Sequence, residues 1–202
     1  MVDAGVGADR RSVAITGASD HGFSEAIYLP DPDGIGIELY ADRSRQEWPP
    51  LDRIDRIAPQ PLDLEGLLEA ADDERAEDGA DPRLMVGHLH LHVGDIEAAR
   101  GFYGGVIGFE EQIVMPSAVF VSAGGYHHHL AFNLWRGGLV PPAPRGAIGL
   151  ERWTILVGTS EELVTVAERA LAAGVKPERS TDGELGLRAP DGIAVVMAVA
   201  DR

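Results

Sequence analysis

The chain has 202 residues, of which 45% are hydrophobic and 25% are charged, a composition typical of a globular protein. Its formal net charge of -16 argues against a nucleic-acid partner, because phosphate binding needs clustered lysine and arginine, and the absence of cysteine excludes disulfides and thiolate chemistry. Without a membrane-length apolar run or a signal-peptide pattern, we expect a cytoplasmic protein with no membrane partner.

The N-terminal part of the chain predicts a β-hairpin. The apolar run at residues 13–15 is followed by turn chemistry at residues 16–22. Two strand candidates, residues 24–29 and 35–40, flank the segment Pro30-Asp31-Pro32-Asp33-Gly34. This segment favours a turn because proline fixes φ, aspartate caps nearby backbone groups and glycine accepts a positive φ. Glu38 lies in the return strand, either as a solvent-facing carboxylate or as a metal ligand with partners elsewhere.

Residues 43–83 have the character of a connection that contains one short helix. Residues 63–71 show helical spacing of their apolar side chains. Residues 72–82 are acidic and rich in helix breakers, which is typical of a solvated linker. We interpret this segment as a boundary between modules.

Residues 84–93 predict a strand in which three histidines alternate with apolar residues. His88, His90 and His92 therefore share one face, and the apolar residues share the other face, which we assign to the core. A histidine face of this kind is either unusually polar or a binding surface. A helix is expected next, with Asp95 as its N-cap and one apolar face made by Ile96, Ala99, Phe102, Tyr103 and Val106.

The second half of the chain predicts two copies of one supersecondary unit. Strands at residues 113–115, 118–121 and 127–132 follow the helix. The same order then recurs: a strand at 153–157, a helix capped near Ser160, weak strands at 175–178 and 185–187, and a closing hairpin at 189–197. Pro190-Asp191-Gly192-Ile193 repeats Pro32-Asp33-Gly34-Ile35. Residues 13–40 therefore resemble the end of a βαβββ unit whose complete copies are 84–134 and 150–199.

Residues 19–43, 87–109 and 122–135 resemble the vicinal oxygen chelate superfamily of glyoxalases, bleomycin-resistance proteins and extradiol dioxygenases, and most of all its catechol-2,3-dioxygenase-like members with four βαβββ modules. The resemblance implies an α+β fold in which paired modules form open, cup-shaped barrels around a metal. The expected domains are a partial module at 1–42, a linker with a short helix at 43–83, and βαβββ modules at 84–146 and 147–202. Relative to four-module members, the chain is expected to be N-terminally shortened.

The resemblance also implies metal ligands. His88 stands at the first-strand ligand position of its module, and Glu38 stands at the last-strand carboxylate position of the partial module. In the final module these positions hold Arg152 and Val196, so that module alone is not expected to bind a metal. We therefore predict a site across the linker that combines Glu38 with His88.

A third ligand is expected from the histidine run before residue 130. His127 and His129 would alternate onto the same strand face as Ala131, the aligned ligand position, and His129 is the predicted ligand. His128 would face the other way unless a bulge intervenes. Two imidazoles and a carboxylate suit Fe(II), with open positions for a bidentate substrate and O₂. Mn(II), Ni(II) and Zn(II) are alternatives with such ligands.

The resemblance implies metal-dependent extradiol cleavage of a catechol-like substrate, a small aromatic or other small molecule. His21, Tyr126 and His128 match positions near the reaction centre and are the expected catalytic residues, since a histidine exchanges protons near neutral pH. A glyoxalase-type isomerase or lyase and a non-catalytic, small-molecule-binding remnant of the superfamily are the alternatives. The open strand edges of an incomplete module predict a homodimer.

Overall fold

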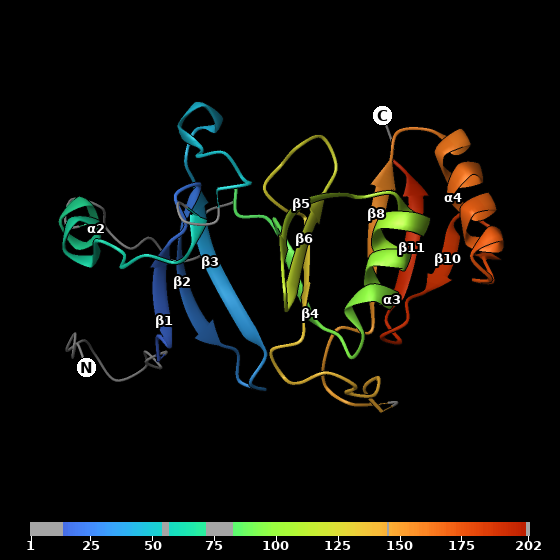
Figure 1. Cartoon of the computed structure of the whole chain (residues 1–202), viewed down its shortest axis with the longest axis horizontal. Coiled ribbons are helices and arrows are strands. Elements are labelled where there is room, and N and C mark those ends of the chain that lie inside the picture. The colour runs from blue at the N-terminus through green and yellow to red at the C-terminus, as the bar shows by residue number, and fades with distance from the viewer. Residues whose placement is uncertain (1–13, 54–56, 72–82, 145, 201–202) are drawn as a thin grey trace. The chain divides into compact units, whose positions relative to one another are not determined.

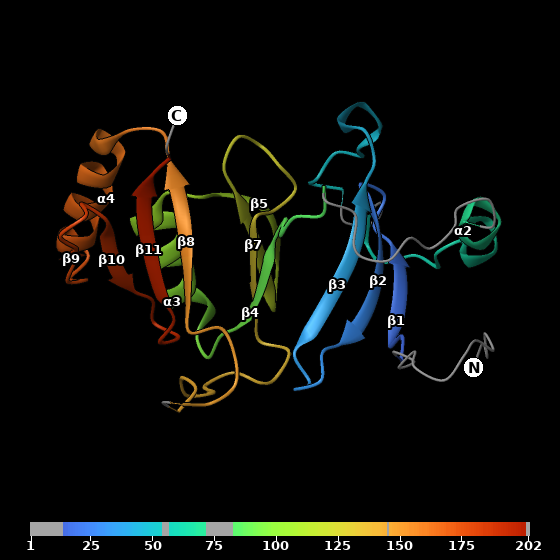
Figure 2. The same cartoon turned by 180° about the vertical axis from the view of Figure 1, so that it is seen from behind.

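The computed structural model describes residues 14–53, 57–71, 83–144 and 146–200. The chain divides into two compact units, Met1–Gly79 and Ala80–Arg202, whose elements are labelled in Figures 1 and 2. The division falls inside the predicted connection at residues 43–83. The acidic linker predicted at residues 72–82 lies outside the described residues, and the module boundaries themselves remain predictions.

The first unit contains an antiparallel sheet in the order β1-β2-β3, formed by Gly17–Asp20, Ser24–Pro30 and Gly36–Asp42. The predicted hairpin is confirmed, because β2 and β3 pair along their whole length. In its turn, Gly34 adopts a φ of 84° and its N–H donates to the Asp31 carbonyl. The prediction of a turn throughout residues 16–22 was wrong, because residues 17–20 gain main-chain hydrogen bonds to β2 that outweigh their weak strand propensity.

One guanidinium connects the strands at an end of this sheet. Arg43 donates to both carboxylate oxygens of Asp20, at 2.6 and 2.8 Å, and to Glu25 at 2.7 Å. This arrangement lowers the pKa of Asp20, chiefly through the hydrogen bond from Arg43. The unit also contains η1 (Arg45–Glu47) and α2 (Leu64–Ala71), which confirms the predicted helix although none of its residues is buried.

The second unit consists of two βαβββ modules with the same topology. The first comprises β4 (Leu89–His92), α3 (Ile96–Arg100), η2 (Gly101–Ile107), β5 (Glu110–Met115), β6 (Ala118–Ser122) and β7 (Leu130–Asn133). The second comprises β8 (Arg152–Val157), α4 (Ser160–Ala172), β9 (Glu178–Arg179), β10 (Leu185–Arg188) and β11 (Ala194–Val199). Their sheets have the orders β4-β7-β6-β5 and β8-β11-β10-β9, with the first strand parallel to the last. The predicted α+β fold class and module repeat are confirmed.

Both modules of this unit contribute to one hydrophobic core. The predicted helical face is buried, with Phe102, Tyr103 and Val106 each at most 2% exposed, and it joins Leu163 and Val166 of α4 in the same cluster. Asp95 caps α3 as expected, because its carboxylate accepts hydrogen bonds from two backbone N–H groups of the first turn. Among the helices that the structure describes, none has the length and apolarity needed to cross a membrane.

Candidate functional site

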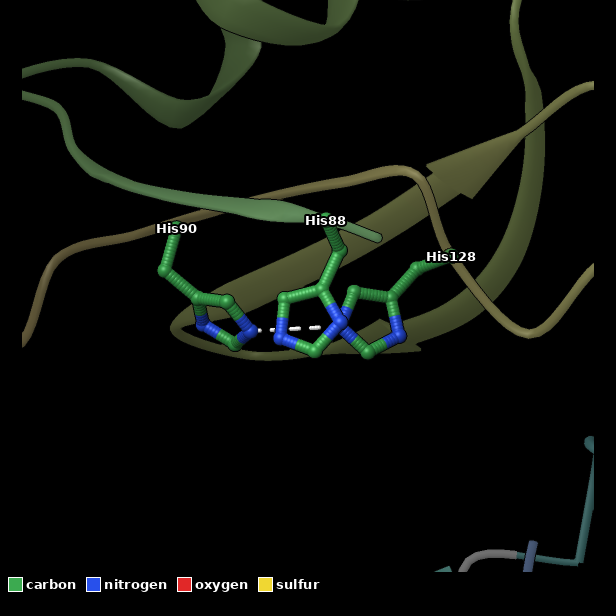
Figure 3. Close-up of side chains that lie close together, drawn as sticks. All are labelled: His88, His90 and His128. Carbon is green, nitrogen blue, oxygen red and sulfur yellow. Dashed lines mark hydrogen bonds between the residues drawn. The ribbon is translucent and has the colours of Figure 1, made fainter. Parts of the chain in front are cut away.

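Three imidazoles converge in the second unit (Figure 3). His88 directly precedes β4, His90 lies within β4, and His128 comes from the loop before β7. One ring nitrogen of each lies within 4.8 Å of the other two, and His90 Nε2 is 3.1 Å from His128 Nε2. The His88 ring centroid is 4.9 Å from that of His90 and 4.3 Å from that of His128. This cluster is compatible with a divalent metal site.

Strand alternation explains the two histidines at β4 but not the third. His88 and His90 are two residues apart and lie on one face, as predicted. The strand predicted at residues 127–132 instead begins at Leu130, after a loop in which Gly124 and Gly125 have φ values of 68° and 67°. The alternation assumed for residues 127–129 was therefore wrong, and the loop brings His128 to His88 and His90.

The remaining residues of the histidine loop make other contacts. His129 Nδ1 accepts a hydrogen bond from the Ala123 N–H at 3.2 Å, and burial lowers the pKa of His129. The Tyr126 ring lies against His127 and His129, with centroids 4.0 and 4.8 Å apart, and its carbonyl accepts from Ser122 Oγ. The structure thus groups His128, rather than His129, with His88 and His90. The ligand role of His129 and the catalytic role of Tyr126 stay predictions.

The first unit holds a second polar constellation around Tyr28. His21 Nε2 lies 2.7 Å from the Tyr28 hydroxyl, and the β2–β3 register places Tyr28 directly opposite Glu38. Burial, followed by the negative charge of Glu38 and a hydrogen bond to it, raises the pKa of Tyr28. One hydrogen arrangement satisfies all three groups: His21 donates to the Tyr28 oxygen, and the Tyr28 hydroxyl donates to Glu38.

Tyr28 was not predicted from the sequence, although the hairpin contained a signal for it. A turn that fixes the register also fixes which residue faces Glu38. The closing hairpin has the same turn, with Gly192 N–H donating to the Ala189 carbonyl at 2.9 Å, and it pairs Gly186 with Val196. These two residues occupy the positions of Tyr28 and Glu38. The final module therefore lacks the tyrosine as well as the expected carboxylate.

The predicted set of Glu38 and His88 joins residues from different compact units, so it stays a prediction. Within residues 14–53, 57–71, 83–144 and 146–200, one group of three histidine or acidic side chains is close enough to hold a metal ion, and it is His88, His90 and His128. His92 is not in this group, and its Nδ1 lies 2.7 Å from Asn133 Oδ1. Neither His21 nor Glu38 is in it.

Comparisons with known proteins place this geometry in a family. A model of the Glyoxalase/Bleomycin resistance protein/Dioxygenase superfamily matches residues 85–197, more than half of the chain. The catechol-2,3-dioxygenase of Bacillus subtilis (strain 168) is 46% identical over 171 residues, which cover 81% of this chain and 58% of that protein. The chain therefore spans less than two thirds of the length of this relative.

A solved structure shows the same fold at low sequence identity. A glyoxalase/dioxygenase from Nostoc punctiforme has a TM-score of 0.50 and 13% identity, and the match covers 63% of this chain and 100% of that one. The residues that the family model matches run from just before β4 into β11. The chain belongs to the Glyoxalase/Bleomycin resistance protein/Dioxygenase superfamily.

Proposed function

We propose that the protein is a metal-dependent extradiol dioxygenase that opens the ring of a catechol-like substrate beside its diol. The observation that best supports this function is the hydrogen-bonded set of His21, Tyr28 and Glu38, in a chain 46% identical to a catechol-2,3-dioxygenase. The set combines a donor and acceptor of protons with a carboxylate. Ring cleavage next to a diol needs such groups around two substrate oxygens.

A divalent metal would supply a template for two adjacent substrate oxygens and for O₂. Fe(II) is the proposed ion, with Mn(II), Ni(II) and Zn(II) as alternatives. Glu38, in the first unit, is the carboxylate ligand proposed for this ion.

The proposed proton transfer involves His21 and Tyr28. Because the pKa of Tyr28 is raised, its hydroxyl keeps its proton at neutral pH and acts as a hydrogen-bond donor. His21 Nε2 lies 2.7 Å from the oxygen of that hydroxyl, and an imidazole can act as a general base. We propose that His21 takes a proton from the substrate diol through its other ring nitrogen, Nδ1, and that Tyr28 orients the His21 ring by accepting from its Nε2.

The test is O₂ consumption by the untagged protein after anaerobic loading with Fe(II), using catechol as the substrate. We expect uptake of O₂ together with a yellow ring-opened product, and loss of both in Glu38→Gln. Conversion of the substrate without O₂ uptake would refute the dioxygenase and support an isomerase or lyase. Absence of any conversion after separate loading with Fe(II), Mn(II), Ni(II) and Zn(II) would refute an enzymatic function on catechol.

A homodimer remains part of the proposal. The described sheets end in strands with free edges, such as β5 and β9, and paired chains cover edges of this kind. Light scattering should give the mass of two chains. A monomer mass across the working concentration range would contradict it.

A further inference from the structure

We propose that His88, His90 and His128 form a metal centre of their own, in which three imidazoles bind one divalent transition metal without a carboxylate ligand. All three belong to the second unit, so the centre needs no residue of the first. The inference does not depend on ring cleavage. A metal-binding measurement tests this proposal without any assay of dioxygenase activity.

The spacing of the nitrogens fits coordination. Two nitrogens 3.1 Å apart, each bonded to a metal at about 2.1 Å, subtend an angle of roughly 95° at the metal. This angle lies between the octahedral and tetrahedral values. Two such bonds span at most about 4.2 Å, whereas the largest separation in the cluster is within 4.8 Å. A small rotation of one ring therefore brings all three nitrogens within bonding distance.

The surroundings hold the ligand rings in place. His128 Nδ1 lies 2.7 Å from His127 Nδ1, so its other nitrogen, Nε2, is the one directed at His90. His127 is fully buried, and Phe120 packs edge-on against His128 with ring centroids 5.0 Å apart. A hydrogen bond to the outer nitrogen of a ligand histidine fixes ring orientation and typically changes metal affinity 10–100-fold. We therefore assign His127 as the positioning residue of the centre.

The preference of imidazole ligands for certain metals indicates which ions this centre should bind. Neutral imidazoles suit Zn(II), Cu(II), Fe(II) and Ni(II), whereas Mg(II) and Ca(II) prefer oxygen ligands. Three protein ligands also leave at least one coordination position open, as in zinc sites that bind water. The centre should therefore discriminate strongly against Mg(II) and should accept Co(II), whose visible absorption reports the coordination geometry.

The experiment is titration of the untagged, chelator-treated protein with Co(II), followed by its visible absorption and by equilibrium dialysis. We expect one ion per chain in this centre and at least a 100-fold loss of affinity in His90→Gln, a substitution at an exposed residue that should leave folding intact. His127→Gln should weaken binding about 10-fold or more while keeping a visible band, because it removes an orienting contact and not a ligand.

Two control variants make the result decisive. His92→Gln changes an exposed histidine of the same strand that contacts Asn133, and it should keep full Co(II) affinity. Glu38→Gln should also keep it, even if it loses all O₂ uptake. Equal losses in His92→Gln and His90→Gln would show non-specific binding to surface histidines and overturn the proposal. Loss in Glu38→Gln with retention in His90→Gln would overturn it in favour of a carboxylate-containing site.

Discussion

The Tyr28 hydroxyl is the group through which His21 contacts Glu38. Tyr28→Phe removes only this oxygen and leaves the ring in the sheet. We expect kcat to fall about 100-fold or more, the usual contribution of a positioned proton-transfer group, while bound metal per chain stays unchanged. Steady-state O₂ uptake and metal analysis of the same preparation check both parts. An unchanged kcat would remove Tyr28 and its hydrogen bond to His21 from the proposed chemistry.

Asp191 is a half-buried carboxylate in the turn that closes the final module. Burial raises its pKa, although the Ile193 N–H and the Tyr103 hydroxyl, which donates at 3.1 Å, act in the opposite direction. A raised pKa means that the folded state binds this proton more tightly than the unfolded state. The resulting stabilisation is complete below the unfolded pKa and is lost as pH rises through the folded pKa.

Asp191→Asn removes that titration and keeps a side chain that can bond to both neighbours. We expect the free energy of unfolding of the variant, relative to the wild type, to increase as the pH rises from 4 to 8. Urea unfolding at several pH values measures the difference. A difference that is independent of pH would mean that Asp191 titrates alike in both states.

The family resemblance predicted His88 as a ligand, and local periodicity placed His90 on the same strand face, although His90 was not itself predicted as a ligand. His88 and His90 share a face because strand residues two apart always do. The orientation of His128 could not be predicted, because residues 127–129 precede β7 and lie in a loop where strand alternation does not hold. Tyr28 was missed because its significance comes from the residue opposite it, Glu38, ten positions later.

At the scale of elements, η2 ends in a tight approach between the two modules. Gly108 has a φ of 98°, and a Cβ there would lie 2.6 Å from Arg169 Nη1. The Arg169 guanidinium also donates to the Ile107 carbonyl at 3.2 Å and so satisfies the end of η2. Gly108→Ala should destabilise the protein by about 1–3 kcal/mol, because it adds backbone strain at a positive φ and displaces the Arg169 guanidinium.

Gly101, at the start of η2, is the matched control. Its φ of -57° is helical, and a Cβ there meets nothing within 4 Å. Gly101→Ala should therefore stabilise the protein by about 0.5–1 kcal/mol. Urea unfolding of both variants compares them directly. Equal effects of the same sign would contradict the role assigned to the Gly108 conformation.

The boundaries of strands could be predicted from the sequence where the turns between them contain characteristic turn residues. The Asp31–Ile35 and Ala189–Ile193 turns form the same pair of backbone hydrogen bonds, so the repeat could be found from four residues. Strand β1 could not be predicted from the sequence, because Gly17–Asp20 has the composition of a turn. Its extended conformation depends on pairing with β2. In such segments, hydrogen bonds to a distant strand determine the backbone conformation, and local strand propensity does not predict them.

At the scale of the whole molecule, metal binding should appear as stability. An ion that binds only the folded chain stabilises it by about 2.7 kcal/mol at a free concentration 100 times its Kd. We expect Zn(II) to raise the urea midpoint of the wild type and a chelator to reverse the effect. His90→Gln should show little or no shift. An equal shift in this variant would place the stabilising ion elsewhere.

The fold of the second unit was predictable because each module repeats the same pattern of strands and helix. The combination of Glu38 with His88 is of a different kind, since it joins residues from two compact units and no local pattern determines it. The three-histidine cluster required tertiary structure too, because His128 is 38 residues from His90 in the sequence. Sequence periodicity identifies candidate ligands, whereas the fold decides which of them meet.

The fate of molecular oxygen tests the proposed function most directly. The metal-loaded protein would be incubated with catechol under ¹⁸O₂, and the product would be analysed by mass spectrometry. A dioxygenase inserts both atoms of O₂, so the account predicts a ring-opened product that carries two ¹⁸O atoms before exchange with water. A product without ¹⁸O, or one that carries a single ¹⁸O with the ring intact, would contradict extradiol cleavage.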